Sequence, residues 1–417
     1  MNLSAEVLNR VRRALPRCAL AVALVAACGQ PPVTIDTVTL ASNPNSALAE
    51  RVAVSTHGAS TAHVVWWAGD GVQHETPPTP VPASGSVTLD VLGLAASTAY
   101  EAQVVAEASG ATTRSATSSF TTGPLPSALA GVHLEVSGTP PDSYVLVDLL
   151  NDKSPGALVA FDGAGTVRWY RLFDGTDPVV EAKQLPSGNY LAFVGPTKFA
   201  SSGGSYMEVT PAGDFVHAYA SAPPLAPDDH EGLLTAEAMS DERVHLLGFD
   251  AQTVGNYLVS FRNLDSIFVI DSHTGDVLWS LGGKRSDFTF VGVPLNGFSG
   301  QDCARLLPNG DILLLDNGSL HDPPMTRAAE YALDTAAHTA RLVWEFRPPE
   351  PVFNAFTGSA LRDAAGTTWV GLSYPGVIYR AAADGTVMWK ATLAAGGQPP
   401  LFYRAVPVRS LYQYLPP

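Results

Sequence analysis

The sequence predicts an all-β chain in which a β-sandwich is followed by a β-propeller. The composition is the first reason, because 37 glycines and 33 prolines among 417 residues favour many short elements joined by turns. The second reason is an internal repeat of turn-and-strand units in the later part of the chain. Hydrophobic residues make up 46% of the chain, which is enough for the sizeable cores of two domains.

The first 27 residues have the pattern of a bacterial export signal. Residues 1–17 are rich in arginine, and the apolar run 18–27 is too short to span a bilayer. Small residues then lead to Cys28, and this resembles a bacterial lipoprotein box. We therefore expect residues 1–27 to be a signal peptide and Cys28 to be lipidated, with simple secretion as the alternative. The expected location is the cell envelope, on the periplasmic or cell-surface side, with the N-terminal lipid as the only membrane contact.

Charge and cysteine content exclude other classes of partner and framework. The net charge is −15, and no basic run follows residue 17, so binding to nucleic acid is not expected. Three cysteines cannot provide a disulfide framework for an exported protein of this length.

Residues 28–123 are predicted to form the β-sandwich. Several segments alternate apolar and polar residues, as strands with one buried face do: 33–41, 51–58 and 61–69. Leu92-Gly93-Leu94, then Tyr100, then a closing Phe120-Thr121-Thr122 resemble a fibronectin type III domain. The resemblance implies that Tyr100 pins a corner of the sandwich and that the domain is a spacer or adhesion module.

Residues 124–417 contain two interleaved kinds of repeat. In one, a glycine turn leads into a strand with a Trp or another aromatic residue: 162–172, 210–220, 272–282 and 383–393. In the other, a Leu-Pro-x-Gly turn leads into an apolar strand: 185–193 and 307–315. Steps of roughly 40–60 residues, each with several short strands, indicate propeller blades. A β-helix would need a shorter period and a TIM barrel would need amphipathic helices. Six blades is the preferred count, with five or seven as alternatives.

A dense group of polar residues flanks the strand predicted at 307–315. Its members lie before the strand, after it, and at the start of the next: Gln301, Asp302, Asn317, His321 and Arg327. These side chains could converge on the central channel, where propeller ligands usually bind. The alternative is structural: Asp316-Asn317-Gly318 is a tight turn and Arg327 pairs with a nearby carboxylate. From the spacing alone, the structural alternative is favoured. A buried inert thiol is likewise favoured over a nucleophile for Cys303.

A second candidate is the run Asp228-Asp229-His230-Glu231, which precedes an apolar segment. A histidine there is more often a hydrogen-bonding turn residue than a catalyst. The acidic residues could bind calcium, although their spacing matches no EF-hand. No zinc-peptidase, α/β-hydrolase or Walker motif occurs in the chain.

Residues 145–410 resemble the bacterial arylsulfotransferase family, including its shorter propeller branch. The pieces that carry the resemblance are VLVDLLNDKSPGALVAFDGAGTVRWY, LPSGNYLAF, the His230-Glu231 step, FVIDSHTGDVLWSLGGKRSDFTF, QDCARLLPNGDILLLDNG and TRAAEYALD. The block 265–334 is the most specific, because motif order and spacing agree there as well as residue type.

The resemblance implies transfer of a sulfuryl group from a phenolic sulfate to a phenol without a nucleotide donor, through a sulfohistidine. It implies catalytic roles for His230, for Arg327 as the cation that meets the sulfuryl oxygens, and for Asp302. Gln301, Asn317 and His321 are expected to bind substrate. No cofactor and no metal is expected, and the partners are a small phenolic sulfate donor and a phenol acceptor.

The chain departs from the family pattern at Asp302, where the family usually has a histidine, and it has no histidine near Gly358-Ser359. The alternative function is therefore a catalytically degenerate propeller that acts as a cell-surface binding or adhesion module. A third hypothesis is a quinone-cofactor enzyme or an eight-bladed scaffold. It comes from the motif Asp271-x-x-Thr274-Gly275-x-x-x-Trp279, which is similar to the tryptophan-docking motif of quinoprotein propellers.

Overall fold

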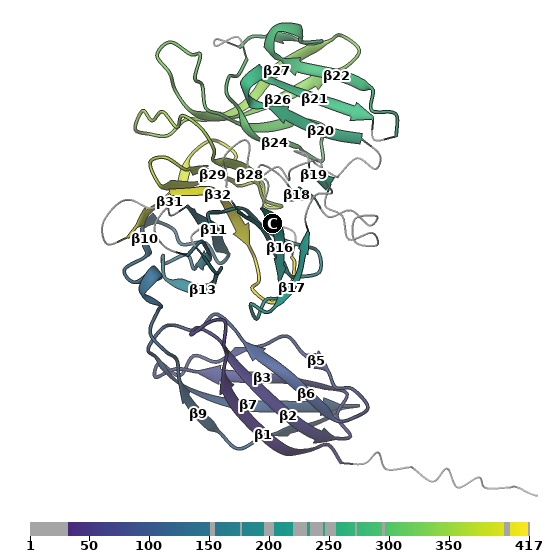
Figure 1. The fold of residues 1–417 in the computed structure, drawn as a ribbon, viewed down its shortest axis with the longest axis vertical. Helices are drawn as coiled ribbons and strands as arrows, with labels where there is room; N and C mark the ends of the chain where they lie inside the picture. The colour runs from purple at the N-terminus through teal and green to yellow at the C-terminus, as the bar shows by residue number, and fades with distance from the viewer. Residues whose placement is uncertain are drawn as a thin grey trace, which may run out of the picture.

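The computed structural model describes residues 32–150, 155–175, 177–195, 204–219, 232–233, 245–246, 256–271, 273–293, 297–395 and 401–415. The predicted signal peptide and Cys28 lie outside this range. Within it the chain is almost entirely β-strand, which confirms the predicted fold class, and its helices are three 3-10 turns: η1 (Ser127–Leu129), η2 (Arg262–Leu264) and η3 (Gly283–Arg285). No helix in these residues is long and apolar enough to cross a membrane. Figure 1 shows the sandwich at one end and the propeller sheets beyond it.

Two antiparallel sheets form the N-terminal sandwich. The first has the order β1 (Thr34–Ser42), β2 (Glu50–His57), β6 (Ser86–Val91). The second has the order β4 (His74–Glu75), β3 (Thr61–Trp67), β7 (Ala99–Ala108), β8 (Ala111–Arg114), with β5 (Thr79–Pro80) on β3 and β9 (Ser118–Thr121) on β7. Alternate residues of β2, including Val52 and Val54, are buried between the sheets. The period of two in the sequence therefore produces one core-facing side on each strand.

Tyr100 lies where the sequence placed it, at the start of β7. Its hydroxyl accepts a hydrogen bond of 2.8 Å from the backbone N–H of Ala95, and its ring stacks on Phe120 with centroids 5.5 Å apart. This ties the strand to the loop before it, as a tyrosine corner does. The fibronectin type III assignment itself stays a prediction.

The remaining strands form the blades of the propeller, which Figure 1 shows beyond the sandwich. The sheets that the described residues form are, from the inner strand outward: β14 (Val179–Gln184), β15 (Tyr190–Val194), β16 (Ser205–Val209), β17 (Phe215–Tyr219); β20 (Asn256–Phe261), β21 (Ser266–Asp271), β22 (Val277–Gly282); β24 (Asp302–Leu306), β25 (Ile312–Asp316), β26 (Arg327–Asp334), β27 (Thr339–Phe346), β23 (Thr289–Val291); β28 (Ser359–Arg362), β29 (Thr368–Leu372), β30 (Val377–Ala381), β31 (Val387–Ala394), β10 (His133–Gly138); and β32 (Leu401–Val408), β11 (Tyr144–Leu150), β12 (Ala157–Phe161), β13 (Val167–Leu172). A short pair, β18 (Gly232–Leu233) and β19 (His245–Leu246), stands apart. The inner strands β14, β32, β28 and β24 contact one another in that order, and β20 contacts β24. The blade count of six stays a prediction.

The two ends of the propeller chain are joined within its sheets. Strand β10, near the start, pairs with β31, near the end, so that His133 lies opposite Ala394. The last strand, β32, pairs with β11, so that Tyr144 lies opposite Val408. The first and last blades are therefore each completed by a strand from the other end of the chain.

The predicted glycine repeat is a single recurring turn. The N–H of Gly165 donates to the carbonyl of Asp162 at 2.9 Å, and Gly213 donates to Thr210 in the same way at 2.8 Å. The φ angles of these two glycines are 85° and 81°, in the left-handed region where glycine has no steric cost. The same bond recurs at other repeat positions: Gly188, Gly310, Gly366 and Gly385. The repeat thus marks the hairpin turns of successive blades.

Tryptophans after these turns join neighbouring blades. Trp169 donates from Nε1 to the carbonyl of Pro211 at 2.7 Å, and Trp389 donates to the carbonyl of Gly163 at 3.1 Å. Both indoles are buried. The sequence singled out Trp279 for this role, but the described contact of its ring is an edge-on approach to Phe288 at 5.5 Å.

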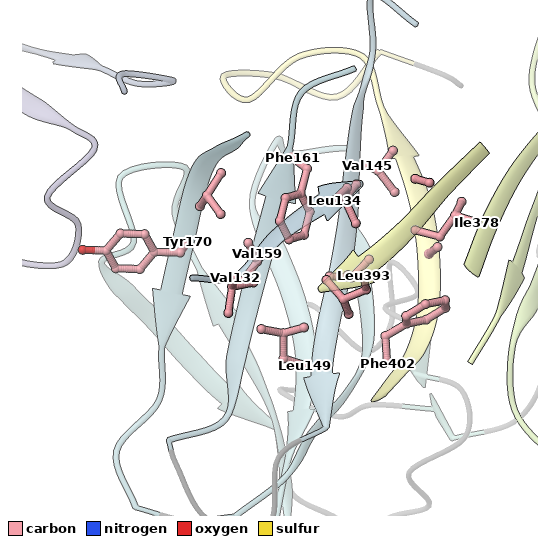
Figure 2. Packing of buried hydrophobic residues seen from close by; sticks show 14 of the residues in the cluster. Val132, Leu134, Val145, Leu149, Val159, Phe161, Tyr170, Ile378, Leu393 and Phe402 are labelled. Carbon is pink, nitrogen blue, oxygen red and sulfur yellow. The ribbon is translucent and has the colours of Figure 1, made fainter. Parts of the chain in front are cut away.

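The largest buried cluster lies between the first and last blades. Figure 2 shows Val145, Val159 and Phe161 of the first blade facing Ile378 and Leu393 of the last. Burying a side chain of this size stabilises the fold by about 1.5–3 kcal/mol. Apolar packing between sheets, rather than a cofactor or metal, therefore accounts for this contact.

The sandwich is docked firmly on the propeller. Arg51 and Asn45 both bind Asp214 in the β16–β17 turn, Arg51 through an ion pair and Asn45 through a hydrogen bond of 2.8 Å. The hydroxyl of Tyr170 accepts a bond of 2.7 Å from the N–H of Ala47, and Figure 2 shows its ring pointing out of the cluster. Together these bonds connect the sandwich to two blades, so its orientation is fixed by side chains of both domains.

Candidate functional site

The polar residues around β24, β25 and β26 meet at one edge of their sheet. Asp302 begins β24, and Asp316 ends β25 directly opposite Arg327, which begins β26. Asp302 lies opposite Leu315, one residue earlier on β25. Antiparallel pairing therefore brings to one edge the residues that the sequence places before and after the strand.

Arg327 is completely buried, and each of its nitrogens is bonded. Nε donates to Asp316 Oδ2 at 3.0 Å and Nη1 donates to Glu345 Oε2 at 2.8 Å. Nη2 donates to the carbonyl of Gly297 at 2.8 Å and to the Tyr331 hydroxyl at 3.1 Å. Burial acts to lower the pKa of Arg327, but Tyr331, Asp316 and Glu345 outweigh it and raise the pKa. These are the ion pairs of the structural alternative considered from the sequence.

Asp316 also orients His321. Its Oδ2 atom lies 2.9 Å from Nε2 of the buried His321, and its Oδ1 atom accepts a bond of 3.0 Å from the N–H of Ser299. One carboxylate therefore joins an imidazole, a guanidinium and a loop amide. His321 is held at the same end of the sheet as Arg327, which the sequence also predicted to belong to the site.

Asp302 and Asn317 form the second part of the cluster. Asn317 Nδ2 donates to Asp302 Oδ2 at 2.7 Å and to the carbonyl of Gly300 at 2.8 Å. The side chain of Asp302 is 12% exposed, and Arg262 Nε lies 3.8 Å from its Oδ2 atom. Asn317 is buried and accepts a bond of 3.0 Å from Asn354 Nδ2. The structure thus brings together two predicted site residues and adds two that were not predicted.

Gln301 and Cys303 point into packing between blades. Gln301 is buried, and its Nε2 atom donates to Ser260 Oγ at 3.0 Å and to the carbonyl of Ser266 at 3.1 Å. The thiol of Cys303 is free and buried, with Sγ 3.8 Å from the carbonyl of Ala360 on the neighbouring inner strand. Both contacts join β24 to an adjacent blade. For Cys303 this is the buried thiol that the sequence favoured over a nucleophile.

Arg262 and Asn354 were missed from the sequence. Arg262 directly follows β20, and Asn317 directly follows β25, so the two occupy matching places in neighbouring blades. Comparing the residues just after each apolar strand would have identified Arg262. No comparable pattern marks Asn354, which lies in the loop between β27 and β28 and acts through contacts distant in sequence.

The other predicted chemistry falls outside the site or outside the described residues. His230 and its acidic neighbours 228, 229 and 231 are not among the described residues. Within the described part of the chain, no group of three or more His, Cys, Asp or Glu side chains could hold a metal ion. Clefts of about 480 and 320 Å³ lie where the sandwich meets the propeller, lined by Asn45 and Tyr170 in one and by Asp90 and Tyr412 in the other. None of the predicted site residues lines either cleft.

Comparisons with known proteins give one informative match. Residues 225–394 match the family model described as arylsulfotransferase (ASST). No curated protein matches the chain. Similar solved structures include a protein of unknown function from Bacteroides caccae (14% identity over 84% of this chain and 100% of that one, TM-score 0.31). They also include a streptogramin B lyase (12%, 63% and 89%, 0.36) and the Cps50 (Swd1) β-propeller domain of Myceliophteria thermophila (14%, 58% and 68%, 0.24).

Likenesses of that size carry no functional argument. The family match is more specific, because residues 225–394 include every strand from β18 to β31 and hence Asp302, Asn317 and Arg327. The part of the chain that forms the candidate site is therefore related to the arylsulfotransferases.

Proposed function

We propose that this protein is a nucleotide-independent aryl sulfotransferase that moves a sulfuryl group from a phenolic sulfate ester to a phenol. The observation that carries the proposal is the arylsulfotransferase match, because it covers the blade whose strand ends gather Asp302, Asn317, His321 and Arg327. A carboxylate, an imidazole and a guanidinium in one place are the groups that sulfuryl transfer needs.

The proposed reaction has two balanced steps. In the first, a nitrogen of His230 attacks sulfur, an N–S bond forms, the S–O bond of the donor breaks, and the released phenolate takes up a proton. In the second, the acceptor phenol attacks sulfur, the N–S bond breaks, and the phenolic proton passes to a base, for which Asp302 is the candidate. His230 is assigned through the resemblance alone, since it lies outside the described residues.

The bonds of Arg327 favour a positioning role within this proposal. Its guanidinium has no exposed surface, and it holds Asp316, which in turn holds His321. Direct contact with the sulfuryl oxygens, as the family resemblance implies, would require the pair with Asp316 or Glu345 to open. Arg327→Lys separates these roles. Lysine keeps the charge but not the fork of bonds, so a positioning role predicts loss of both activity and stability.

The activity test uses 4-nitrophenyl sulfate as donor and phenol as acceptor, with the purified full chain. We expect release of 4-nitrophenolate that depends on phenol, and its loss in His230→Ala. His273→Ala is the matched control, because that side chain is 82% exposed in a hairpin turn away from the site. Absence of acceptor-dependent release in the wild-type protein between pH 5 and 10 would refute the proposal.

A second candidate function is a non-catalytic binding or adhesion module. Two observations favour it: Asp302 stands where the family usually has histidine, and Arg327 is engaged in internal ion pairs. This function predicts saturable binding of an anionic aromatic ligand or a glycan without turnover. Binding by wild type and by His230→Ala with equal affinity, and no phenolate release by either, would decide for it.

We also propose that the chain is exported to the cell envelope and anchored by a lipid on Cys28. The sequence before Cys28 supports this, and the described residues add no evidence for or against it. Cys28→Ser should move the protein from the membrane fraction to the soluble exported fraction. Unchanged fractionation, with the same processed mass, would contradict the anchor.

A further inference from the structure

Two arginines from neighbouring blades reach the end of the propeller where the candidate site lies, and only one of them is accessible. Arg327 is buried, and each of its nitrogens is bonded. The side chain of Arg262 is 33% exposed, and its Nη2 atom donates to the carbonyl of Ala355. Its Nε atom has no hydrogen-bond partner among the described residues. Arg262 therefore retains donor capacity at the rim of the site.

Two exposed aromatic rings lie beside Arg262. Phe356 is 47% exposed and Tyr374 is 60% exposed, and their rings meet edge to face with centroids 6.3 Å apart. The buried side chain of Asn354 positions both, because its Nδ2 atom donates to the carbonyl of Phe356 at 3.1 Å and its Oδ1 atom accepts from the N–H of Tyr374 at 2.8 Å. Large apolar side chains held in the open by a buried amide point to a ligand that covers them.

The aromatic pair, the arginine and the carboxylate belong to one connected set. Ala355, which binds Arg262, stands between Asn354 and Phe356 in the chain. Asn354 donates to Asn317 at 3.0 Å, and Asn317 donates to Asp302 at 2.7 Å. Asp302 in turn lies 3.8 Å from Arg262 Nε. These contacts place a cation, an anion and two rings at a single rim.

We infer that Arg262 binds the sulfuryl oxygens of an aryl sulfate and that Phe356 and Tyr374 hold its ring, an inference that rests on the proposed sulfuryl transfer. A guanidinium matches the oxygens of a sulfate ester in a planar, two-bond geometry. Aromatic rings favour edge-on and offset contacts with another ring. Asp302 repels a second anion but accepts the proton of a neutral phenol. The rim therefore selects one anionic ester and one uncharged acceptor.

The first test is binding, measured by calorimetry on the full chain with 4-nitrophenyl sulfate. Arg262→Met should weaken binding about tenfold or more, because it removes the charged donor. Arg262→Lys should give an intermediate loss, since it keeps the charge without the fork. Arg114→Met is the control, because Arg114 is an exposed arginine of the sandwich. Thermal unfolding of each variant establishes that it is folded.

The second test separates ring recognition from charge recognition. Wild type should bind 4-nitrophenyl sulfate several-fold more tightly than cyclohexyl sulfate, which carries the same anion on a ring without π electrons. Phe356→Leu and Tyr374→Leu should each reduce that preference. Phe215→Leu is the control, because Phe215 is 58% exposed on β17 of another blade.

The outcomes distinguish this inference from the proposed function. Wild-type affinity in Arg262→Met, no binding of 4-nitrophenyl sulfate by wild type, or an unchanged aryl preference in both leucine variants would overturn it. If turnover occurs but these variants do not affect it, the transferase proposal stands and the rim assignment falls. If the variants weaken binding as expected in a protein without turnover, the rim assignment stands and the transferase proposal falls.

Discussion

The indole nitrogen of Trp389 donates a hydrogen bond of 3.1 Å to the carbonyl oxygen of Gly163, and so connects the last blade to a hairpin turn of the first. Trp169 makes the equivalent bond from the first blade to the carbonyl of Pro211 in the next. Each tryptophan follows its glycine turn by four residues, so a motif local in sequence produces a contact between blades. The propeller is held together by repeated contacts of this kind as well as by apolar packing.

Replacing Trp389 should therefore weaken the closure between blades. We expect Trp389→Phe to cost about 1 kcal/mol through the lost hydrogen bond, and Trp389→Ala to cost about 3–5 kcal/mol through the added cavity. Urea unfolding measures both. Trp67→Phe is the control, because the Trp67 indole bonds to Glu101 on the exposed surface of the sandwich. Equal costs for the two phenylalanine variants would contradict a special role for Trp389.

The ion pair between Asp316 and Arg327 gives a second prediction. Both side chains are fully buried, so Arg327→Met leaves an uncompensated carboxylate and should cost about 3–5 kcal/mol. The double variant with Asp316→Asn should cost less than the sum of the single variants by about 1–3 kcal/mol, measured in a denaturation cycle.

The control for that cycle is Lys390→Met. Lys390 pairs with Glu350 at 3.0 Å on the surface, where the two side chains are 31% and 68% exposed. We expect it to cost about 0–1 kcal/mol. Additive costs for Asp316→Asn and Arg327→Met would show that the two buried groups do not act as a pair.

Asp148 predicts a pH dependence of stability. Complete burial raises the pKa of Asp148 to about 7 from its usual 3.8, although the N–H groups of Arg404, Ala182 and Tyr403 bond to its carboxylate and oppose the rise. Because the pKa is higher in the folded state, the folded protein binds the proton more tightly between pH 4 and 7. The contribution of this group to stability is thus full below about pH 4 and is lost as the pH rises towards 7.

Asp148→Asn should remove this dependence. Relative to wild type, the variant should be less destabilised at pH 8 than at pH 5, by at most about 3 kcal/mol. Urea unfolding of both proteins at the two pH values measures the difference. The exposed Asp142→Asn serves as the control. A difference between variant and wild type that stays constant with pH would refute the prediction.

Tyr412 tests the docking of the sandwich on the propeller. Its hydroxyl accepts a hydrogen bond of 2.8 Å from the N–H of Leu92, across the boundary between the domains. Tyr412→Phe leaves that N–H without its acceptor and should cost about 1–3 kcal/mol. Tyr414→Phe, at a tyrosine that is 36% exposed, should be close to neutral. Domains that unfold independently, with the sandwich transition unchanged in Tyr412→Phe, would contradict firm docking.

The sequence predicted those features that depend on neighbouring residues. The turns at Gly165 and Gly213 require a left-handed backbone that glycine supplies, so the repeat was visible without coordinates. The corner at Tyr100 followed from its place at the start of a strand. Even the pairing of Arg327 with a nearby carboxylate was among the alternatives, because Asp316 lies at the end of the preceding strand.

Contacts between distant segments could not be predicted in this way. Nothing around Asn45 indicates that its amide binds Asp214, which is 169 residues later. The approach of Arg262 to Ala355 likewise depends on two blades being packed side by side. Residue spacing within one blade therefore located part of the site, whereas the accessible cation and the aromatic rim required the arrangement of adjacent blades.

The pairing of β32 with β11 and of β10 with β31 has a consequence for biosynthesis. Hairpins such as β15–β16 need only neighbouring residues, so they can form while the nascent chain is still emerging. The first blade lacks its inner strand until residues 401–408 have been made, and pairing across so long a stretch is entropically slow. Ring closure is thus a late event of maturation, and a polypeptide halted before its final strand would leave the backbone of β11 open to pairing with another chain.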